Sequence, residues 1–304
     1  MKILIIGAAG FIGSHLYEKL KKDKHEVVGI DNFFHSSSHP IIKDVEYADV
    51  RYYQDIESYI KWADIVYHLA AQIHVDKSIT NPQETLDINV TGTLNVLEAV
   101  KKYNKKMVFA SSSEVYGTQK CQMTELHQLD CQSPYAASKV AGDRLCKSYC
   151  DTYGTQVAIL RNFNTFGSYQ ADESYGGVIA IFTRLALQNK PLTIFGDGTQ
   201  ERDYMSIKDA IKGYEFCIEK ELWGKPVNVG TGKTISIKEI AKKIIELTGS
   251  KSKIIYGDPR PGEVQRLCAD ISFAEKNGFE ISTNFNDNLK EYVKWYKKDY
   301  LACG

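Results

Sequence analysis

Several features that would narrow the function of a protein are missing from this sequence. Neither sign of charge is in excess, because Lys plus Arg and Asp plus Glu each number 38 among the 304 residues, so no overall field favours nucleic acid or an anionic membrane surface. No apolar run approaches the length of a membrane-spanning helix, and the run at 3–6 is too short for the core of a signal peptide. We therefore expect a cytoplasmic protein that binds neither nucleic acid nor a membrane.

The cysteines show no pattern of a disulfide or metal framework. They number seven, an odd count, and no Cys-x-x-Cys pair occurs, which favours reduced thiols. Cys146 and Cys150 share a helix face but have no further Cys or His nearby to complete a ligand set. We expect no metal site. With 43% hydrophobic and 25% charged residues, the composition is that of a globular protein.

The N-terminal half alternates between apolar strands and helical patterns. This alternation is typical of an α/β fold with a doubly wound parallel sheet, the Rossmann arrangement. After Gly167 the alternation breaks, so we expect a smaller substrate-binding lobe over 167–304, from which about 207–230 returns to the large domain because 227–230 resembles another buried strand. Strands are expected at 2–6, 26–30, 64–69, 106–110 and 156–160, and helices at 12–22, 82–103, 134–153 and 178–188.

A glycine-rich turn follows the first expected strand. Its glycines, spaced G-x-x-G-x-x-G, let the backbone approach a pyrophosphate, and the start of the next helix faces the negative charge. A purely structural glycine turn is the alternative reading. The turn contains Gly7, Gly10, Phe11, Ile12 and Gly13.

The end of the second expected strand indicates which dinucleotide binds. Asp31, followed by Asn32, can accept hydrogen bonds from an adenosine ribose and repel a 2'-phosphate, so NAD is favoured over NADP. Asp49 and Val50 are candidate adenine contacts, although Asp49 is equally well explained as an exposed turn residue. We therefore assign 1–166 to an NAD-binding domain.

Chemically active side chains follow the strand expected at 106–110. That strand delivers Ser111 to Glu114 into a cleft at its C-terminal end. Tyr135 and Lys139 are four residues apart in a helical pattern, so they lie on one face. A cation there favours the tyrosinate and lowers the pKa of the phenol toward neutrality, which makes Tyr135 a base for a hydroxyl while hydride leaves the same carbon. The alternative is a Tyr and a Lys on a helix surface.

Taken together, these motifs resemble the extended short-chain dehydrogenase/reductases that act as nucleotide-sugar epimerases and dehydratases. The resemblance implies a bound NAD that oxidises the sugar at C4, with Ser112 holding the C4 hydroxyl beside Tyr135. It also implies a homodimer packed through the helices at 82–103 and 134–153. The motifs are the glycine turn, Leu69-Ala70-Ala71, Ser112 to Gly117, Tyr135-x-x-x-Lys139 and Arg161-Asn162-Phe163-Asn164.

The second half contains residues that the resemblance assigns to the sugar nucleotide. Asn164 and Arg202 would hold the diphosphate, and the arginine fork suits phosphate oxygens. Phe195 would stack on the base, and Val178 would lie at the same site. Arg260 and Glu263 would contact phosphate and ribose, or else form a solvated ion pair on a proline-stiffened loop.

The product depends on Glu114. In similar 4,6-dehydratases a glutamate at this position removes the C5 proton, whereas a 4-epimerase needs no such group. Ser113 stands where many dehydratases have an aspartate, so the acid that protonates the leaving hydroxyl is open. We first interpret the protein as a nucleotide-sugar 4,6-dehydratase, with 4-epimerase as the alternative and uronate decarboxylase or a non-catalytic NAD-binding regulator behind them. Base, hexose and C2 substituent stay undetermined.

Overall fold

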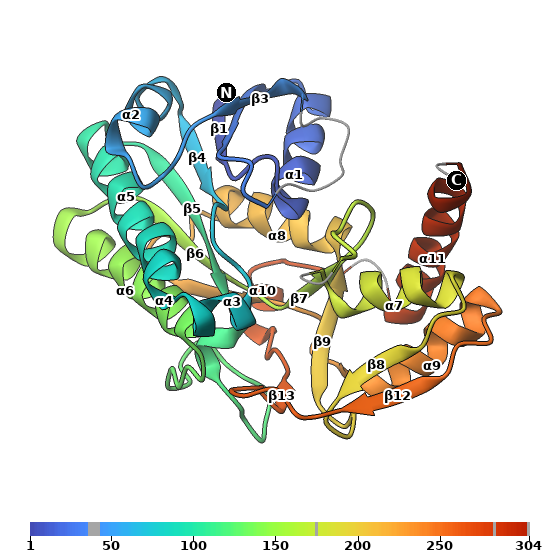
Figure 1. The fold of residues 1–304 in the computed structure, drawn as a ribbon. Helices are drawn as coiled ribbons and strands as arrows, with labels where there is room; N and C mark the ends of the chain where they lie inside the picture. The colour runs from blue at the N-terminus through green and yellow to red at the C-terminus, as the bar shows by residue number, and fades with distance from the viewer. Residues whose placement is uncertain (36–42, 174–175, 282–283, 303–304) are drawn as a thin grey trace.

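A seven-stranded parallel sheet forms the centre of the molecule. The computed structural model describes residues 1–35, 43–173, 176–281 and 284–302, and within them the strand order is β3-β2-β1-β4-β5-β6-β10 (Figure 1). In this order β1 and β4 lie at the point where the direction of winding reverses, which is where such sheets bind dinucleotides. The expected Rossmann sheet is confirmed. Its strands are β1 (Lys2–Ile6), β2 (Glu26–Asp31), β3 (Val45–Tyr47), β4 (Ile65–His68), β5 (Lys106–Ser112), β6 (Val157–Asn162) and β10 (Pro226–Val229).

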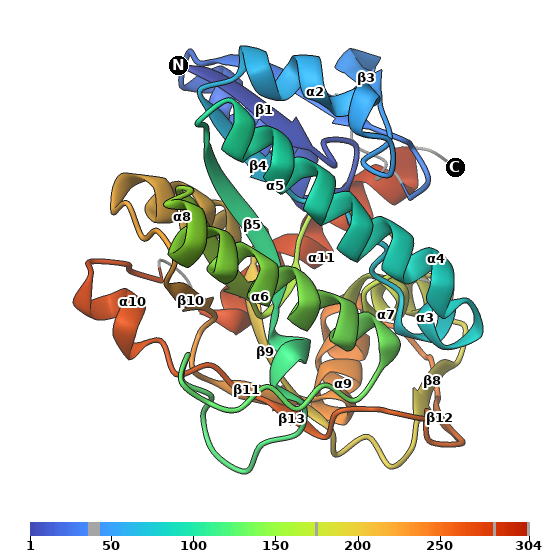
Figure 2. The same ribbon diagram turned by 90° about the vertical axis from the view of Figure 1, so that its left-hand side faces the viewer.

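Helices cover both faces of this sheet. Alternate strand residues point to opposite layers: Ile5 packs in the core under α1 and α8, whereas Leu4 and Ile6 pack in the core under α2, α5 and α6. Figure 2 shows α5 and α6 side by side across the second layer. These helices are α1 (Phe11–Lys22), α8 (Ile207–Glu219), α2 (Tyr53–Trp62), α5 (Gly92–Lys102) and α6 (Pro134–Tyr153).

The helix expected over 82–103 changes its winding along its length. It begins as α4 (Pro82–Leu86), continues as a π-helical segment at Asp87–Thr91 and ends as α5. The short helix α3 (Val75–Thr80) precedes it. A π-helical segment inside a helix frequently marks a functional site, because it redirects one side chain. Here the redirected region contains the buried Asn89.

A smaller lobe stands beside the large sheet, with its own apolar core (Figure 1). One small sheet joins β11, β9, β13 and β7, and a second pairs β8 with β12. No helix among the described residues is both long and apolar enough to cross a membrane. The elements of this half are β7 (Asn164–Phe166), α7 (Val178–Leu187), β8 (Leu192–Phe195), β9 (Glu201–Ser206), β11 (Thr234–Ser236), α9 (Ile237–Thr248), β12 (Ile254–Gly257), β13 (Arg266–Leu267), α10 (Ser272–Lys276) and α11 (Phe285–Ala302).

The chain leaves the large sheet after β6 and later returns to it. The strand expected at 227–230 is present as β10, which pairs with β6, and α8 covers the sheet just before it. The division of the chain at residue 166 itself stays a prediction.

Candidate functional site

A cavity of about 400 Å³ opens at the C-terminal ends of β1, β4 and β5. It brings together the glycine turn, the end of β2 and the start of α6, which lie far apart in the sequence. Most of the residues expected to bind the cofactor or react line it: Gly7, Gly10, Phe11, Ile12, Gly13, Asp31, Asn32, Val50, Leu69, Ala70, Ala71, Ser112, Ser113, Glu114, Tyr135, Lys139 and Asn164.

The fold requires glycine at positions 7 and 13 of the turn, whereas at Gly10 the absence of a side chain leaves the backbone accessible from the cavity. Gly7 has a φ of +90°, and a Cβ on it would lie 2.6 Å from the Ala70 backbone nitrogen. A Cβ on Gly13 would overlap the Gly7 carbonyl oxygen and lie 2.9 Å from the Ala8 Cα. On Gly10, which caps α1 without a side-chain hydrogen bond, the nearest contact would be 3.3 Å away. This cradle at a helix N-terminus therefore fits a pyrophosphate.

The carboxylate at the end of β2 is held by the backbone. Its oxygens accept hydrogen bonds from the Ala9 N–H at 3.0 Å and the Phe33 N–H at 2.8 Å. Burial raises the pKa of Asp31 above its usual value, although these hydrogen bonds oppose the change. The carboxylate lines the cavity, where a ribose can donate to its remaining lone pairs.

Asp49, expected as an adenine contact or as an exposed turn residue, is buried and is not among the residues that line the cavity. Its carboxylate accepts hydrogen bonds from Arg51 Nη2 at 2.6 Å and Asn32 Nδ2 at 3.0 Å. Burial opposes ionisation, but the Arg51 guanidinium holds the pKa of Asp49 below its usual range. Of the expected pair, Val50 lines the cavity.

Three candidate reacting groups converge from α6 and β5. Helix α6 begins at Pro134, and its Ser133 cap accepts a hydrogen bond from the Ala136 N–H at 3.1 Å. Lys139 Nζ donates to the Ala110 carbonyl at 2.6 Å. Ser112 ends β5 and accepts the Glu114 N–H at 3.2 Å, which caps the short 3₁₀ helix Ser113–Tyr116.

The expected effect of Lys139 on the pKa of Tyr135 is not found. Burial raises the pKa of Tyr135 to about 12; the Ser112 hydroxyl lowers it, and Glu114 raises it further. Burial also lowers the pKa of Lys139 to about 8. The expectation considered the charge of the lysine and not the cost of desolvating both groups. The role of Tyr135 as a base stays a prediction.

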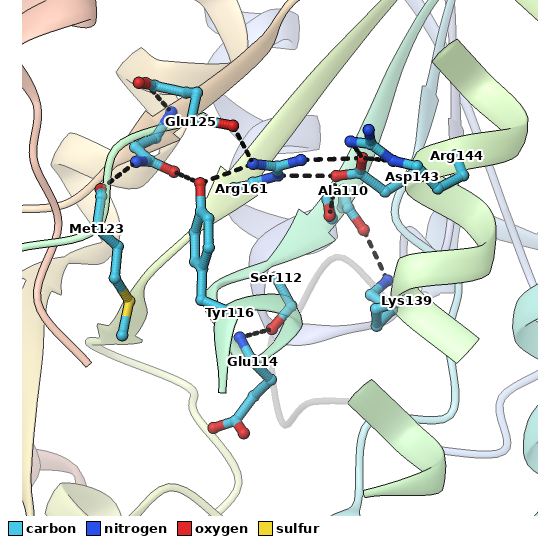
Figure 3. A network of polar contacts seen from close by, with 12 residues as sticks. Ala110, Ser112, Glu114, Tyr116, Met123, Glu125, Lys139, Asp143, Arg144 and Arg161 are labelled. Carbon is cyan, nitrogen blue, oxygen red and sulfur yellow. Dashed lines mark hydrogen bonds and ion pairs between the residues drawn. The ribbon is translucent and has the colours of Figure 1, made fainter. Parts of the chain in front are cut away.

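Glu114 has no fixed partner for its carboxylate. Among the described residues no side chain or backbone group donates a hydrogen bond to it, and Figure 3 shows it pointing away from the neighbouring polar network. Burial raises its pKa, Arg202 lowers it, and Glu263 raises it. Ser113 lies beside it at the cavity wall.

The residues expected to hold the sugar nucleotide are divided among several places. Asn164 lines the main cavity, whereas Phe195 and Glu263 line a second, more open pocket of about 740 Å³. The Arg260 guanidinium lies 4.2 Å from the centroid of the Phe195 ring, so it occupies a face on which a base was expected to stack. Val178, Arg202 and Arg260 are not among the residues that line either pocket.

Sequence patterns did not reveal the buried amide that joins the cavity wall to α6. Asn89 accepts the Gln72 N–H at 2.8 Å and donates to the Gln72 carbonyl at 2.9 Å and to Ser138 Oγ at 2.8 Å. The available signal was an asparagine between the apolar Ile88 and Val90 within the expected helix. Asn162 and Gln170, which also line the cavity, were likewise missed; each has a buried side-chain carbonyl oxygen that accepts no hydrogen bond from the described part of the chain.

Comparisons with known proteins agree with this geometry. The model of the NAD dependent epimerase/dehydratase family matches residues 3–230. A relative from Methanocaldococcus jannaschii, named as a candidate UDP-glucose 4-epimerase, is 38% identical over 98% of this chain and 99% of its own. A UDP-N-acetyl-alpha-D-glucosaminuronate decarboxylase from Bacillus cytotoxicus is 33% identical over 98% of each chain.

A solved structure shares the whole architecture. It is a UDP-glucuronic acid 4-epimerase from Bacillus cereus in complex with UDP-glucuronic acid and NAD. That protein is 32% identical, with a TM-score of 0.91 over 99% of this chain and 100% of the other. The chain belongs to the NAD-dependent epimerase/dehydratase family of nucleotide-sugar enzymes, and NAD is its cofactor.

Proposed function

We propose that this protein is an NAD-dependent 4-epimerase of a UDP-linked hexose or hexuronate. The observation that carries the proposal is the meeting of Tyr135, Lys139 and Ser112 in the cavity that contains the glycine cradle. This set suffices for removing and returning a hydride at C4. The named relatives support UDP as the nucleotide and epimerisation as the reaction, so we now prefer it to the 4,6-dehydratase that the sequence first suggested.

The chain's own groups carry the proton chemistry at C4. Tyr135 takes the proton of the C4 hydroxyl, and Ser112 donates a hydrogen bond to the oxygen that becomes the ketone. Lys139 lies on the same face of α6 as Tyr135, and we propose that its charge favours the tyrosinate only together with the positive charge of oxidised NAD. When bound, NAD supplies the hydride acceptor and, in its oxidised form, a positive charge in the cavity. Rotation of the 4-keto sugar then presents its other face, and Tyr135 returns the proton when the hydride comes back.

Binding of the nucleotide is assigned to the second lobe. Asn164 lies where the main cavity meets that lobe, and Arg202 supplies a cation on β9. We propose that both hold the diphosphate, with Val178 at the start of α7 beside them. Arg260 must leave the Phe195 ring if the base is to stack there and Arg260 is to reach phosphate together with Glu263.

A product analysis tests the reaction. The protein is incubated with UDP-glucose, UDP-N-acetylglucosamine and UDP-glucuronate in separate experiments, and products are examined by mass spectrometry and NMR. Epimerisation leaves the mass unchanged and inverts the C4 configuration. Loss of one water or of carbon dioxide would refute it. No turnover of any nucleotide sugar would favour a non-catalytic NAD-binding regulator.

Elimination of water from the nucleotide sugar, or its decarboxylation, is the second candidate reaction, because Glu114 could act as an acid or base. A carboxylate without a hydrogen-bond partner, whose pKa is raised by burial, can exchange a proton with a bound sugar. In an epimerase the same carboxylate would only border the sugar. The same incubations distinguish these outcomes.

We also propose that the protein forms a homodimer through the face formed by α4, α5 and α6. Ile79, Leu86 and Leu94 are exposed apolar residues on α3, α4 and α5 of this layer. Burying such a patch between two copies accounts for its composition.

We also propose a cytosolic location, because the odd number of cysteines without a Cys-x-x-Cys pair favours reduced thiols.

A further inference from the structure

A buried charged network lies near Ser112 and Lys139 (Figure 3). Arg161 on β6 and Asp143 on α6 are 1% and 0% exposed. Arg161 Nε and Nη2 donate to the Asp143 carboxylate at 2.9 and 3.1 Å. Arg161 Nη1 donates to the Tyr116 hydroxyl at 2.8 Å and to the Glu125 carbonyl at 3.0 Å. Each of the three guanidinium nitrogens therefore donates a hydrogen bond within the protein.

One face of α6 meets β5 at successive points through this network. Tyr135, Lys139 and Asp143 are spaced four residues apart, so they share that face. Ser111 Oγ donates to the Asp143 carboxylate at 2.9 Å, one residue before Ser112. Gly142 lets the backbones approach closely, because a Cβ there would lie 2.6 Å from Phe109 Cζ.

A contribution to stability does not by itself explain the buried ion pair of Arg161 and Asp143. Removing two charges from water costs about as much as their attraction returns, so a buried pair adds little net stability. Its location is informative: Ser111 and Arg161 are register partners on β5 and β6. Asp143 thus connects the strand that ends in Ser112 with the helix that carries Tyr135 and Lys139.

We propose that Asp143 is a positioning residue for the reaction at C4: by holding Ser111 together with Arg161, it fixes α6 against β5 so that Tyr135 and Lys139 face Ser112. This inference rests on the proposed function for its kinetic consequences. Its effect on Lys139 does not depend on the identity of the sugar.

The charge of Asp143 also acts on Lys139. Burial lowers the pKa of Lys139, whereas Cys146 and Asp143 on the same helix raise it. His68 on β4 is buried as well, and desolvation and Lys139 both lower its pKa, so it faces the lysine as a neutral ring. Replacing Asp143 with Asn removes the negative charge and leaves unopposed both of its arginine partners, Arg161 and Arg144. Both changes make Lys139 lose its proton at lower pH.

The first experiment titrates NAD into the full-length protein between pH 6 and pH 10 by calorimetry. We expect NAD affinity to change where Lys139 loses its proton, and in Asp143→Asn we expect this point to move down by roughly half a pH unit or more. Tyr116→Phe is the matched control. It removes a buried hydroxyl from the same network on the side away from α6, and it should leave the titration point unchanged.

The second experiment compares kcat and KM for Ser111→Ala and Tyr116→Phe. Ser111→Ala keeps the ion pair, so it should fold even if Asp143→Asn does not. We expect kcat to fall about tenfold with KM within about twofold, because one hydrogen bond to a charged group is lost from the positioning contact. Tyr116→Phe should lower the melting temperature and leave kcat within about twofold.

The two experiments separate the positioning role from the reaction itself. An Asp143→Asn protein whose NAD titration point equals that of the wild type would overturn the role of Asp143. Equal kcat in Ser111→Ala and wild type would do the same. A wild-type protein that turns over no nucleotide sugar would instead refute the proposed function, and the calorimetric comparison would still decide the positioning role.

Discussion

Two alanine substitutions in the glycine turn should affect different properties: one the stability of the fold, the other the affinity for NAD. In Gly13→Ala the new methyl group would overlap the Gly7 carbonyl oxygen and lie 2.9 Å from the Ala8 Cα, so α1 must move away from the turn. Overpacking of this kind costs about 1–3 kcal/mol. For a chain of this size 1 kcal/mol corresponds to roughly 2 °C, so we expect the melting temperature to fall by about 2–6 °C.

Gly10→Ala should leave the fold intact and weaken the binding of NAD. Its methyl group would meet only the Gly7 carbonyl oxygen at 3.3 Å, and the reduced entropy of the unfolded chain offsets the weaker helix cap. The methyl group would, however, stand where the pyrophosphate approaches. We expect NAD affinity to fall about tenfold to hundredfold, measured by calorimetry beside differential scanning fluorimetry. Unchanged NAD affinity in Gly10→Ala, or an unchanged melting temperature in Gly13→Ala, would refute this account of the turn.

Three further predictions follow from other parts of the structure. Burial lowers the pKa of Lys139 from 10.5 to about 8, so the free energy of unfolding rises with pH between those two values. At pH 7 we therefore expect Lys139→Met to be more stable than the wild type by up to about 3 kcal/mol, and we expect the difference to vanish near pH 10.5. The variant should also lose turnover. Thermal denaturation across that range tests this, and a variant less stable at pH 7 contradicts it. Glu114→Gln should keep kcat of the epimerase within about threefold, since no proton at C5 is moved; loss of turnover with NAD still reduced transiently would instead indicate elimination. Leu94→Lys should convert a dimer into a monomer in light scattering, whereas a wild-type monomer at micromolar concentration would contradict the proposed interface.

Local patterns predicted most of the architecture and part of the site. The spacing of Gly7, Gly10 and Gly13 could be interpreted because a turn between a strand and a helix is a short-range feature. The same holds for Tyr135 and Lys139, which four-residue spacing places on one helix face. Their pKa values could not be obtained in this way, because desolvation depends on how deeply the finished fold buries each group.

Features that join distant segments were not predictable from one sequence. The contacts of Asn89 with Gln72 and Ser138 depend on a π-helical segment that local propensity does not indicate. The placement of Arg260 on Phe195 depends on the pairing of β8, which ends at Phe195, with β12, which ends shortly before Arg260. The pairing of Asp49 with Arg51 was not predicted from the sequence, and the contact of Asp49 with adenine stays a prediction.

The return of the chain to the large sheet has a consequence for synthesis. Strand β6 has no partner on one edge until β10 is synthesised, after the first part of the second lobe. Helix α8 covers its face of the sheet just as late. A nascent chain that ends at residue 166 therefore exposes apolar Leu160 and Ala158 and an unpaired strand edge. Such a fragment is prone to aggregate, so the NAD-binding half completes its folding only after translation has passed residue 229.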